Sequence, residues 1–423
     1  MTASSGSEAG TRCSFLVFLG KDRHPSLIHE TAPLPSRRDL EDGELLLKME
    51  TATICGSDLR TLTGQRTQPT PSILGHEGVG RVLSSKREGV DPGTRVTFST
   101  IDACFECHAC LAGLPQKCPH LLKYGERKIQ ENGGLSGCFS THVLVRKRTR
   151  IVAVPDLIPD PAAATLNCGM ATAVGCLRKA IATFLPRLNS ARACVQGLGL
   201  VGVYSCMYLR EAGFSEVLAC DKNDARLQMA SHFGATRLFR QDWRKEEEED
   251  DEGVDLVVET SGDPRAVEEG LAMLKPGGVY LLIGTGHSDA LFSLSGEDIL
   301  SKCLTITGMQ NCRPEDLDEA VRFLEKTIGT YPYEKLFSPP FPLHQFQALW
   351  RGLEQTSMTV MLPYRRPCRR LLRPGCNASE FIICWAVTVH KAICISIFTE
   401  IPLSQYPKER SLHYQNFCWM IMG

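Results

Sequence analysis

The stretch VQGLGLVG at residues 195–202 limits most strongly what this chain can fold into. Its three glycines have the spacing G-x-G-x-x-G: Gly197, Gly199 and Gly202. They follow a short apolar run, and Leu200 begins a helical pattern that continues to residue 212. In a strand, turn and helix of this kind, the glycines permit the tight turn, the approach of a pyrophosphate and close packing of helix on strand. The first turn of the helix would offer free N–H groups to the phosphates. The motif therefore predicts a dinucleotide site.

Short apolar runs without alternation recur around this motif. They lie at residues 193–196, 216–221, 236–239, 255–260 and 278–285. Runs of this kind are typical of strands that are buried on both faces. Helical stretches lie between several of them, at residues 200–212, 224–233 and 264–274. Strands that alternate with helices indicate a doubly wound parallel sheet, which we expect over residues 166–312.

Asp221 ends the run at residues 216–221, about twenty residues after the glycines. Its carboxylate can accept hydrogen bonds from the adenosine ribose and would repel a 2′-phosphate, so NAD is favoured over NADP. Lys222 and Arg226 weaken this preference, because either side chain could meet a phosphate.

The first 165 residues have a different pattern, in which glycines and prolines interrupt short apolar runs. The runs at residues 44–49, 78–83, 95–99 and 140–145 are predicted to be strands. This part of the chain is therefore expected to be rich in β-structure.

Four cysteines lie within the fifteen residues CFECHACLAGLPQKC: Cys104, Cys107, Cys110 and Cys118. Four thiolates at short intervals can surround one tetrahedral zinc ion. An iron–sulfur cluster is the chemical alternative, but its cysteine runs usually continue as C-x3-C-P, whereas seven residues intervene here. Because four protein ligands leave no position for a substrate, the lobe near residues 100–120 is expected to stabilise the fold.

Three further residues could form a different kind of zinc site. Cys55 lies in ICGSD, His76 in GHEGVG and Cys168 in LNCGMATAV. Three protein ligands would leave the fourth zinc position open, which is how a catalytic zinc site is built. Spacing alone does not show that these residues converge.

Charge and cysteine usage restrict the partners and the compartment. The 423 residues carry a formal net charge of −1, so no basic excess suggests nucleic acid as a partner. The chain has 19 cysteines, and its first twenty residues lack the features of a secretory signal. A reducing compartment is therefore expected, and in such a compartment clustered cysteines more often bind metal than form disulfides. The cytoplasm is the predicted location, with mitochondria as the alternative.

In these motifs the sequence resembles the zinc-dependent medium-chain dehydrogenase/reductase family, which includes zinc-containing alcohol dehydrogenases. The resemblance covers about residues 40–360 and rests on CGSD, GHEGVGRV, the four-cysteine lobe, and VQGLGLVG followed by Asp221. It implies an α/β fold with a GroES-like β-rich catalytic domain at residues 1–165 and a Rossmann domain at residues 166–312. The last strands of the first domain would return within residues 313–363.

The resemblance also implies roles for individual residues. Cys55, His76 and Cys168 would bind catalytic zinc, and the cysteine lobe would bind a second, structural zinc. Ser57 would pass on the substrate proton, Asp58 would support a zinc ligand, and Glu77 would lie behind the metal. Arg60 stands where several family members have a relay histidine.

The implied activity is hydride transfer between an alcohol or carbonyl substrate and NAD(H), in a homodimer or homotetramer. Alternative substrates are an amino alcohol or a polyol, although LNCG replaces the glutamate context of the polyol branch.

Residues 364–423 have no counterpart in the family pattern. The apolar stretch at residues 381–398 is interrupted by His390 and Lys391, so a membrane span is not expected. An extra packed strand pair and a poorly folded terminus are the alternatives. This unusual tail motivates one more hypothesis, that the protein is a catalytically impaired relative that still binds zinc and a nucleotide.

Overall fold

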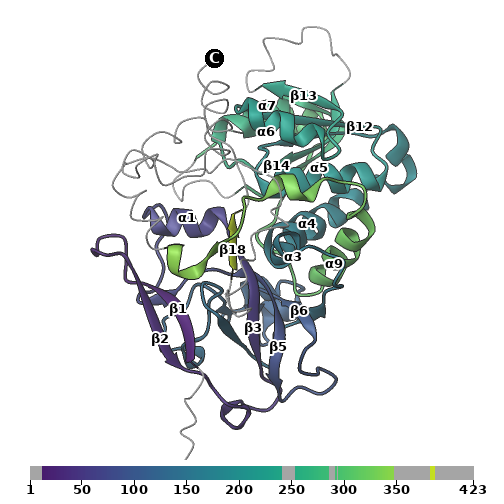
Figure 1. Cartoon of the computed structure of the whole chain (residues 1–423). Helices are drawn as coiled ribbons and strands as arrows, with labels where there is room; N and C mark the ends of the chain where they lie inside the picture. Colours follow the sequence, from purple (N-terminus) through teal and green to yellow (C-terminus); the bar gives the residue numbers. More distant parts are fainter. Residues whose placement is uncertain (1–11, 241–252, 285–290, 293, 347–381, 386–423) are drawn as a thin grey trace, which may run out of the picture.

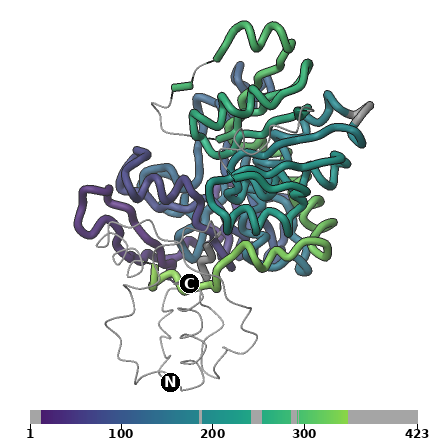
Figure 2. The backbone as a smooth tube through the Cα atoms, turned by 90° about the horizontal axis from the view of Figure 1, so that it is seen from above, coloured from purple at the N-terminus to yellow at the C-terminus, as the bar shows by residue number. Residues whose placement is uncertain are grey.

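The computed structural model describes residues 12–240, 253–284, 291–292, 294–346 and 382–385 (Figure 1). Seen from above in Figure 2, the purple N-terminal strands lie on one side of the molecule and the teal and green segments on the other. These two sides correspond to a β-rich half and a half built around a parallel sheet.

In the β-rich half, the described part of the chain forms twelve strands in three sheets. The strands are β1 (Arg12–Phe18), β2 (Leu27–Pro33), β3 (Leu45–Ile54), β4 (Ser72–Ile73), β5 (Glu77–Ser85), β6 (Arg95–Phe98), β7 (Ile101–Asp102), β8 (Leu122–Lys123), β9 (His142–Val145), β10 (Ile151–Ala153), β17 (Phe341–Pro342) and β18 (Ile382–Trp385). The largest sheet has the order β10-β6-β5-β3-β18-β17, with β9 also paired to β3. The four segments predicted as strands in this half all lie on β3, β5, β6 and β9.

β3 is the central strand of this half, and alternate side chains enter two different cores. Leu45, Leu47 and Met49 pack into the main core of the large sheet. Leu46 points the other way and packs with residues of β1, including Phe15. A strand that is buried on both faces in this way is firmly placed, because a shift of one residue would exchange the two sets of side chains.

The tail contributes one described strand, β18, which lies between β3 and β17 (Figure 1). It runs parallel to β3, with Ile382 opposite Thr51 and Trp385 opposite Ile54. It is antiparallel to β17, so this part of the tail belongs to the largest sheet of the β-rich half. His390 and Lys391 lie outside the described residues. Among those that are described, no helix combines the length and the apolar character that a bilayer crossing needs.

The second half contains a six-stranded, fully parallel sheet in the order β13-β12-β11-β14-β15-β16. Its strands are β11 (Arg192–Gln196), β12 (Glu216–Asp221), β13 (Arg237–Arg240), β14 (Val254–Glu259), β15 (Leu274–Leu282) and β16 (Thr305–Gly308). The α-helices of the described residues are α1 (Gly56–Leu62), α2 (His108–Leu111), α3 (Asp160–Ala164), α4 (Ala171–Ile181), α5 (Leu200–Ala212), α6 (Asp224–Ser231), α7 (Pro264–Met273), α8 (Gly296–Ser301) and α9 (Asp316–Thr327). A π-helical turn, η4 (Leu166–Met170), precedes α4.

Helices cover both faces of this sheet, which confirms the predicted doubly wound architecture. On β11, Ala193 and Val195 pack with residues of α4, α5 and α6. Cys194, between them, faces the opposite side and packs with Val267 and Leu271 of α7. The predicted helix at residues 200–212 is α5, and the other two predicted helices end within two residues of α6 and α7.

The return to the first half begins with a helix, where strands were expected. α9 buries a stripe of apolar side chains against α4 and η4: Leu317, Ala320, Val321 and Leu324. Their spacing is that of one helical face, which explains why this segment is helical. The first described strand of the return is the short β17.

Candidate active site

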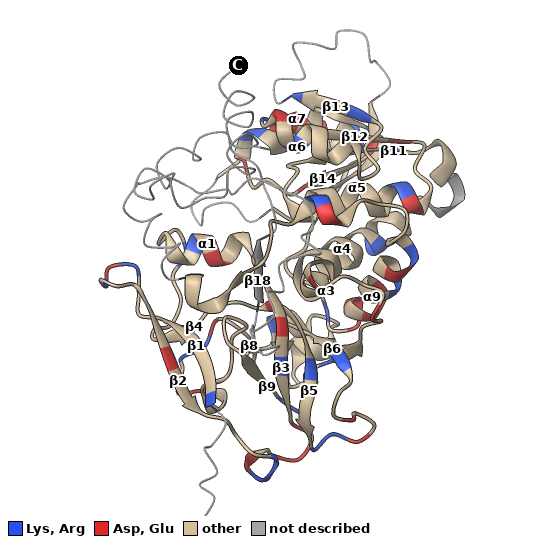
Figure 3. Ribbon diagram, in the orientation of Figure 1, with Lys and Arg blue, Asp and Glu red and all other residues tan. Residues whose placement is uncertain are grey.

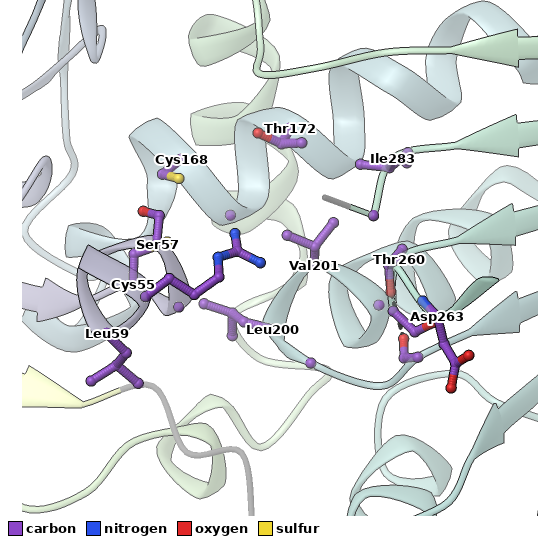
Figure 4. A pocket seen from close by; sticks show the side chains of 18 of the residues that line it. Cys55, Ser57, Leu59, Cys168, Thr172, Leu200, Val201, Thr260, Asp263 and Ile283 are labelled. Atoms are coloured by element: carbon purple, nitrogen blue, oxygen red, sulfur yellow. Dashed lines mark hydrogen bonds between the residues drawn. The ribbon is translucent and has the colours of Figure 1, made fainter. Parts of the chain in front are cut away.

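A cleft of about 1000 Å³ lies between the two halves and is lined by residues of both. Figure 4 shows Cys55, Ser57 and Cys168 on one side of it and Thr260 and Asp263 on the other. Crevices at the carboxyl ends of parallel strands are common nucleotide sites. The candidate metal ligands and the glycine turn therefore open into the same space.

The structure brings the three dispersed residues together. One donor atom from each of Cys55, His76, Glu77 and Cys168 lies within 4.8 Å of the others. Cys55 follows β3 and is the N-cap of α1, whereas His76 immediately precedes β5. Cys168 lies on the π-helical turn η4, an irregularity that is frequent at functional sites.

Asp58 orders two of these groups. Its carboxylate accepts hydrogen bonds from the backbone N–H of Cys55 at 3.0 Å and of Gly75 at 3.2 Å. Its Oδ1 also lies 3.6 Å from Nδ1 of His76. Burial opposes protonation of His76, but the charge and hydrogen bond of Asp58, together with those of Cys55, outweigh it and raise the pKa of the imidazole. A carboxylate at one ring nitrogen is how proteins orient a histidine whose other nitrogen binds metal.

The pKa values of the two thiols are shifted in opposite directions. A hydrogen bond from Cys168 lowers the pKa of Cys55 well below its ordinary value. The same hydrogen bond, together with burial, raises the pKa of Cys168. Two sulfur donors and an imidazole suit zinc, which prefers nitrogen and sulfur ligands. The residues present therefore fit a zinc ion with one open coordination position.

Glu77 lies beneath this cluster and is fully buried. Burial and the nearby Cys55 raise the pKa of its carboxyl to about 8. Thr53, opposite Glu77 in the β3–β5 pairing, donates a hydrogen bond of 2.5 Å to its Oε2. The sequence analysis missed Thr53, although its position two residues before Cys55 was a usable signal.

Asn167 is a second residue that the sequence analysis missed. Its Nδ2 donates hydrogen bonds to the backbone carbonyls of His76 and Phe98, each at 2.9 Å. The backbone carbonyl oxygen of Asn167 lies 3.7 Å from the thiol sulfur of the buried Cys312. Asn167 thereby ties the turn that carries Cys168 to the segment that carries His76. Its place beside a candidate ligand was the available signal.

The four cysteines of the lobe also converge. Their sulfur atoms all lie within 4.8 Å of one another. Backbone N–H groups point at two of the sulfurs, from Cys107 to Cys104 at 3.3 Å and from His120 to Cys118 at 3.3 Å. Hydrogen bonds, first from the backbone of Glu106, lower the pKa of Cys104 to about 6. A set of four clustered sulfurs fits a closed tetrahedral zinc site.

The glycine turn has the close approaches that its motif requires. Gly197 has a φ of +87°, a conformation that favours glycine. A Cβ on Gly202 would lie 1.9 Å from the carbonyl oxygen of Gly197, so any side chain here would displace the turn. Gly199 is the N-cap of α5, and Leu200 is its first residue. All four residues line the cleft.

Asp221 sits beside this turn. Its carboxylate accepts hydrogen bonds from the backbone N–H of Leu198 at 2.8 Å and of Asn223 at 2.9 Å. Nη1 of Arg226 lies 3.5 Å from the same carboxylate, which offsets part of its charge. Lys222 also lines the cleft. The carboxylate is therefore fixed next to the glycines, with two basic side chains nearby.

Comparisons with known proteins agree with this geometry. Residues 41–156 match the model of the alcohol dehydrogenase GroES-like domain, and residues 201–326 match that of the zinc-binding dehydrogenase. An L-threonine 3-dehydrogenase of Bacillus velezensis is 30% identical over 326 residues, which are 74% of this chain and 88% of that protein. The enzyme of the same name from Bacillus subtilis is 29% identical over 82% of this chain and 98% of its own length.

Solved structures share the fold. An alcohol dehydrogenase from Thermotoga maritima aligns with a TM-score of 0.74 and 22% identity, over 89% of this chain and 100% of its own. A zinc-binding dehydrogenase from Sinorhizobium meliloti bound to NADP aligns with a TM-score of 0.70 and 19% identity, over 89% of this chain and 99% of its own. The predicted GroES-like and Rossmann domains are thus confirmed. The chain belongs to the zinc-dependent medium-chain dehydrogenase family, as an oxidoreductase that acts on alcohols with zinc and a nicotinamide nucleotide.

Proposed function

We propose that this cleft catalyses the reversible oxidation of a small alcohol by NAD, at a site formed by Cys55, His76 and Cys168. One observation carries the proposal: three zinc-type donors converge in the same cleft as the glycine turn. Zinc held there would supply a Lewis acid for the substrate oxygen, and the nicotinamide would accept the hydride. The four-cysteine lobe would hold a second zinc, for a total of two per chain.

Ser57 is the proposed group that takes the substrate proton. It lines the cleft on α1, and its hydroxyl donates a hydrogen bond that helps to lower the pKa of Cys55. The hydroxyl thus lies within reach of the proposed metal ligands, as a proton acceptor must. Arg60 lies one helical turn further along, but a guanidinium remains protonated and cannot accept a proton. We therefore route the proton from Ser57 to water in the cleft.

Asp58 and Glu77 are proposed as supporting residues. Asp58 holds His76 in the orientation that leaves its second nitrogen for the metal. Glu77 lies beside the donor cluster, where its protonation state would adjust the charge around the metal.

NAD is the proposed cofactor because the carboxylate of Asp221 is fixed beside the glycine turn. The solved relatives differ in this respect, since one from Sinorhizobium meliloti is bound to NADP and one from Escherichia coli is in complex with NADH. The fold alone therefore does not decide the cofactor. A 2′-phosphate next to Asp221 would meet a negative charge, although Lys222 and Arg226 reduce this penalty.

An amino alcohol is the second candidate substrate, because several similar proteins are L-threonine 3-dehydrogenases. The chain covers 88% of the length of the one from Bacillus velezensis.

We also propose that the protein forms dimers through the edge of its parallel sheet. β16 is the last strand of this sheet and is largely exposed. Leu300 on the neighbouring α8 is 78% exposed, and Leu291 is 89% exposed. An exposed strand edge flanked by apolar side chains favours pairing with another chain.

The cytoplasm is the proposed location, because cysteines clustered at the spacing of metal ligands are typical of proteins in a reducing compartment.

Cofactor reduction, followed at 340 nm with a panel of alcohols and zinc-loaded protein, tests the proposed activity. Cys55→Ala and His76→Ala should each abolish turnover while NAD binding and the zinc of the lobe remain. Cys303→Ala is the matched control, because this cysteine is exposed and lies outside the cleft. Unchanged turnover in the first two variants would refute the assignment of the site. Turnover by the intact 423-residue chain would exclude the alternative that the protein is a catalytically impaired relative of these enzymes.

A further inference from the structure

The half of the cleft that contains Cys55 is lined by three basic side chains. They are Arg60, Arg66 and Lys123. Arg60 lies on α1, which Figure 3 shows with one basic and one acidic segment. Lys123 ends β8 on another part of the chain. Segments far apart in sequence thus contribute positive charge to one space.

Two of these cations share one carboxylate. Arg66 forms an ion pair with Oε2 of Glu126, and Nζ of Lys123 lies 2.6 Å from Oε1 of the same residue. No second carboxylate in the described part of the chain forms an ion pair with either cation. The group therefore carries a net charge of +1. Its side chains are only 29%, 22% and 16% exposed for Arg66, Lys123 and Glu126.

A partly buried excess charge is costly unless it is compensated. Arg66 nevertheless stays charged: burial opposes this, but Glu126 and the charges of Asp58 and Cys55 raise its pKa. The influence of Cys55 also shows that Arg66 lies close to the proposed reaction site. A second anion in the cleft would balance the group.

The acidic residues that line the cleft are distributed differently. Asp221, Asp263 and Glu269 belong to the parallel-sheet half, whereas Glu77 lies buried beside Cys55. Among the described residues that line the cleft near Arg66 and Lys123, none is a carboxylate that could pair with a substrate ammonium. This half of the cleft therefore suits an anion better than a zwitterion.

We infer that the substrate is an alcohol that carries an anionic group, a carboxylate or a phosphonate, which binds Lys123 and Arg66 while its hydroxyl faces Cys55. The inference rests on the proposed function and narrows its substrate class. Arg66 offers a planar pair of N–H donors that matches either anion, and Lys123 adds a point charge.

Matched substrates test the inference. The carboxylate arm compares 3-hydroxybutyrate with its neutral amide, and the phosphonate arm compares 2-hydroxypropylphosphonate with its dimethyl ester. L-threonine serves as the zwitterion. In at least one arm, kcat/KM for the anion should exceed that for its neutral partner by roughly tenfold or more, since hydrogen bonds to charged groups contribute about 1.5–3 kcal/mol. The arm with the larger ratio identifies the anion.

Single substitutions test whether Lys123 and Arg66 cause the preference for the anionic substrate. Lys123→Gln should raise KM for the preferred anion by roughly tenfold, with a smaller change in kcat and no change for the neutral partner. It leaves the ion pair of Arg66 with Glu126 in place. Arg66→Gln is the second variant, and it retains the pair of Lys123 with Glu126. Lys128→Gln is the control, because this lysine is exposed and does not line the cleft.

Binding without turnover separates this inference from the proposed activity. Calorimetry with butyrate and propylphosphonate, which lack the hydroxyl, should show binding to the NAD-loaded protein that weakens in Lys123→Gln. If no alcohol is oxidised but this binding persists, the proposed activity fails and the anion site stands. Equal kcat/KM for anions and neutral partners in both arms would overturn the inference. So would a loss of NAD affinity in Lys123→Gln with unchanged anion binding.

Discussion

Replacing Asn167 with alanine removes the link between the two segments that supply His76 and Cys168. Asn167 is 1% exposed, and its Nδ2 donates both of its hydrogen bonds to backbone carbonyls. The carbonyl groups of His76 and Phe98 belong to residues that are themselves buried, so no solvent replaces the lost donor. The η4 turn would then be held by packing and by its backbone hydrogen bonds.

The size of the effect follows from these two hydrogen bonds. A hydrogen bond of this kind contributes about 1–1.5 kcal/mol net, so the pair corresponds to about 2–3 kcal/mol. If this energy normally holds Cys168 in position, its loss weakens zinc binding by roughly 30- to 150-fold at about 1.4 kcal/mol per factor of ten. This agrees with the roughly 10- to 100-fold that supporting residues of metal sites usually contribute.

Competition with a chromogenic chelator would measure zinc affinity at both sites of Asn167→Ala. One zinc should be released at a lower chelator concentration than in the unchanged protein, whereas the zinc of the lobe should be unaffected and serve as an internal reference. Asn189→Ala is the matched control, because Asn189 is exposed. If Asn167→Ala kept both zinc affinities and the unfolding midpoint of the parent, the positioning role of Asn167 would be wrong.

Three further predictions concern other parts of the molecule. Cys107→Ser should reduce the zinc content from two ions to one and lower the melting temperature, and any loss of turnover should follow from this loss of stability. Loss of activity with full zinc content would contradict a stabilising role. Asp221→Ser should shift the ratio of kcat/KM for NADP over NAD upward by roughly tenfold or more, since it removes a negative charge next to Arg226; an unchanged ratio would exclude Asp221 as the discriminating residue. Burial, with a smaller contribution from Lys48, lowers the pKa of His142 to about 4. His142 therefore binds a proton more readily in the unfolded chain than in the folded protein. As the pH drops from 6.5 to 4, the free energy of unfolding should fall by about 1 kcal/mol per pH unit. Chemical denaturation at several pH values should show that the free energy of unfolding of His142→Gln depends less steeply on pH.

The local patterns of this sequence predicted its elements well. The helix at residues 200–212 follows from the glycine motif and from a buried face, and the parallel strands follow from apolar runs bounded by turns. These signals are contained within about ten to twenty residues, which is the range over which periodicity determines secondary structure. Family resemblance then supplied the arrangement of the two domains.

Contacts between distant segments were harder to predict. Nothing in the residues around Asn167 shows that its side chain reaches the carbonyl of His76, because that contact depends on how η4 packs against β5. The same holds for the ion pair of Glu126 with Arg66, which lies sixty residues earlier in the chain, whereas Lys123 is a near neighbour of Glu126 in sequence. α9 illustrates a different failure, because its helical stripe of apolar residues was present in the sequence but was overlooked in favour of returning strands.

The pairing of β18 with β3 has a consequence for biosynthesis. One edge of β3 is completed in two parts, by β9 along residues 45–48 and by β18 along residues 51–54. β3 is synthesised before the parallel sheet and β18 after it, since all six strands of that sheet come from one continuous stretch between them. The parallel sheet can thus fold during translation, while this part of the edge of β3 stays open until β18 has been made. In this interval the open edge is available to other strands, so the growing chain depends on β18 to protect the strand that leads to Cys55.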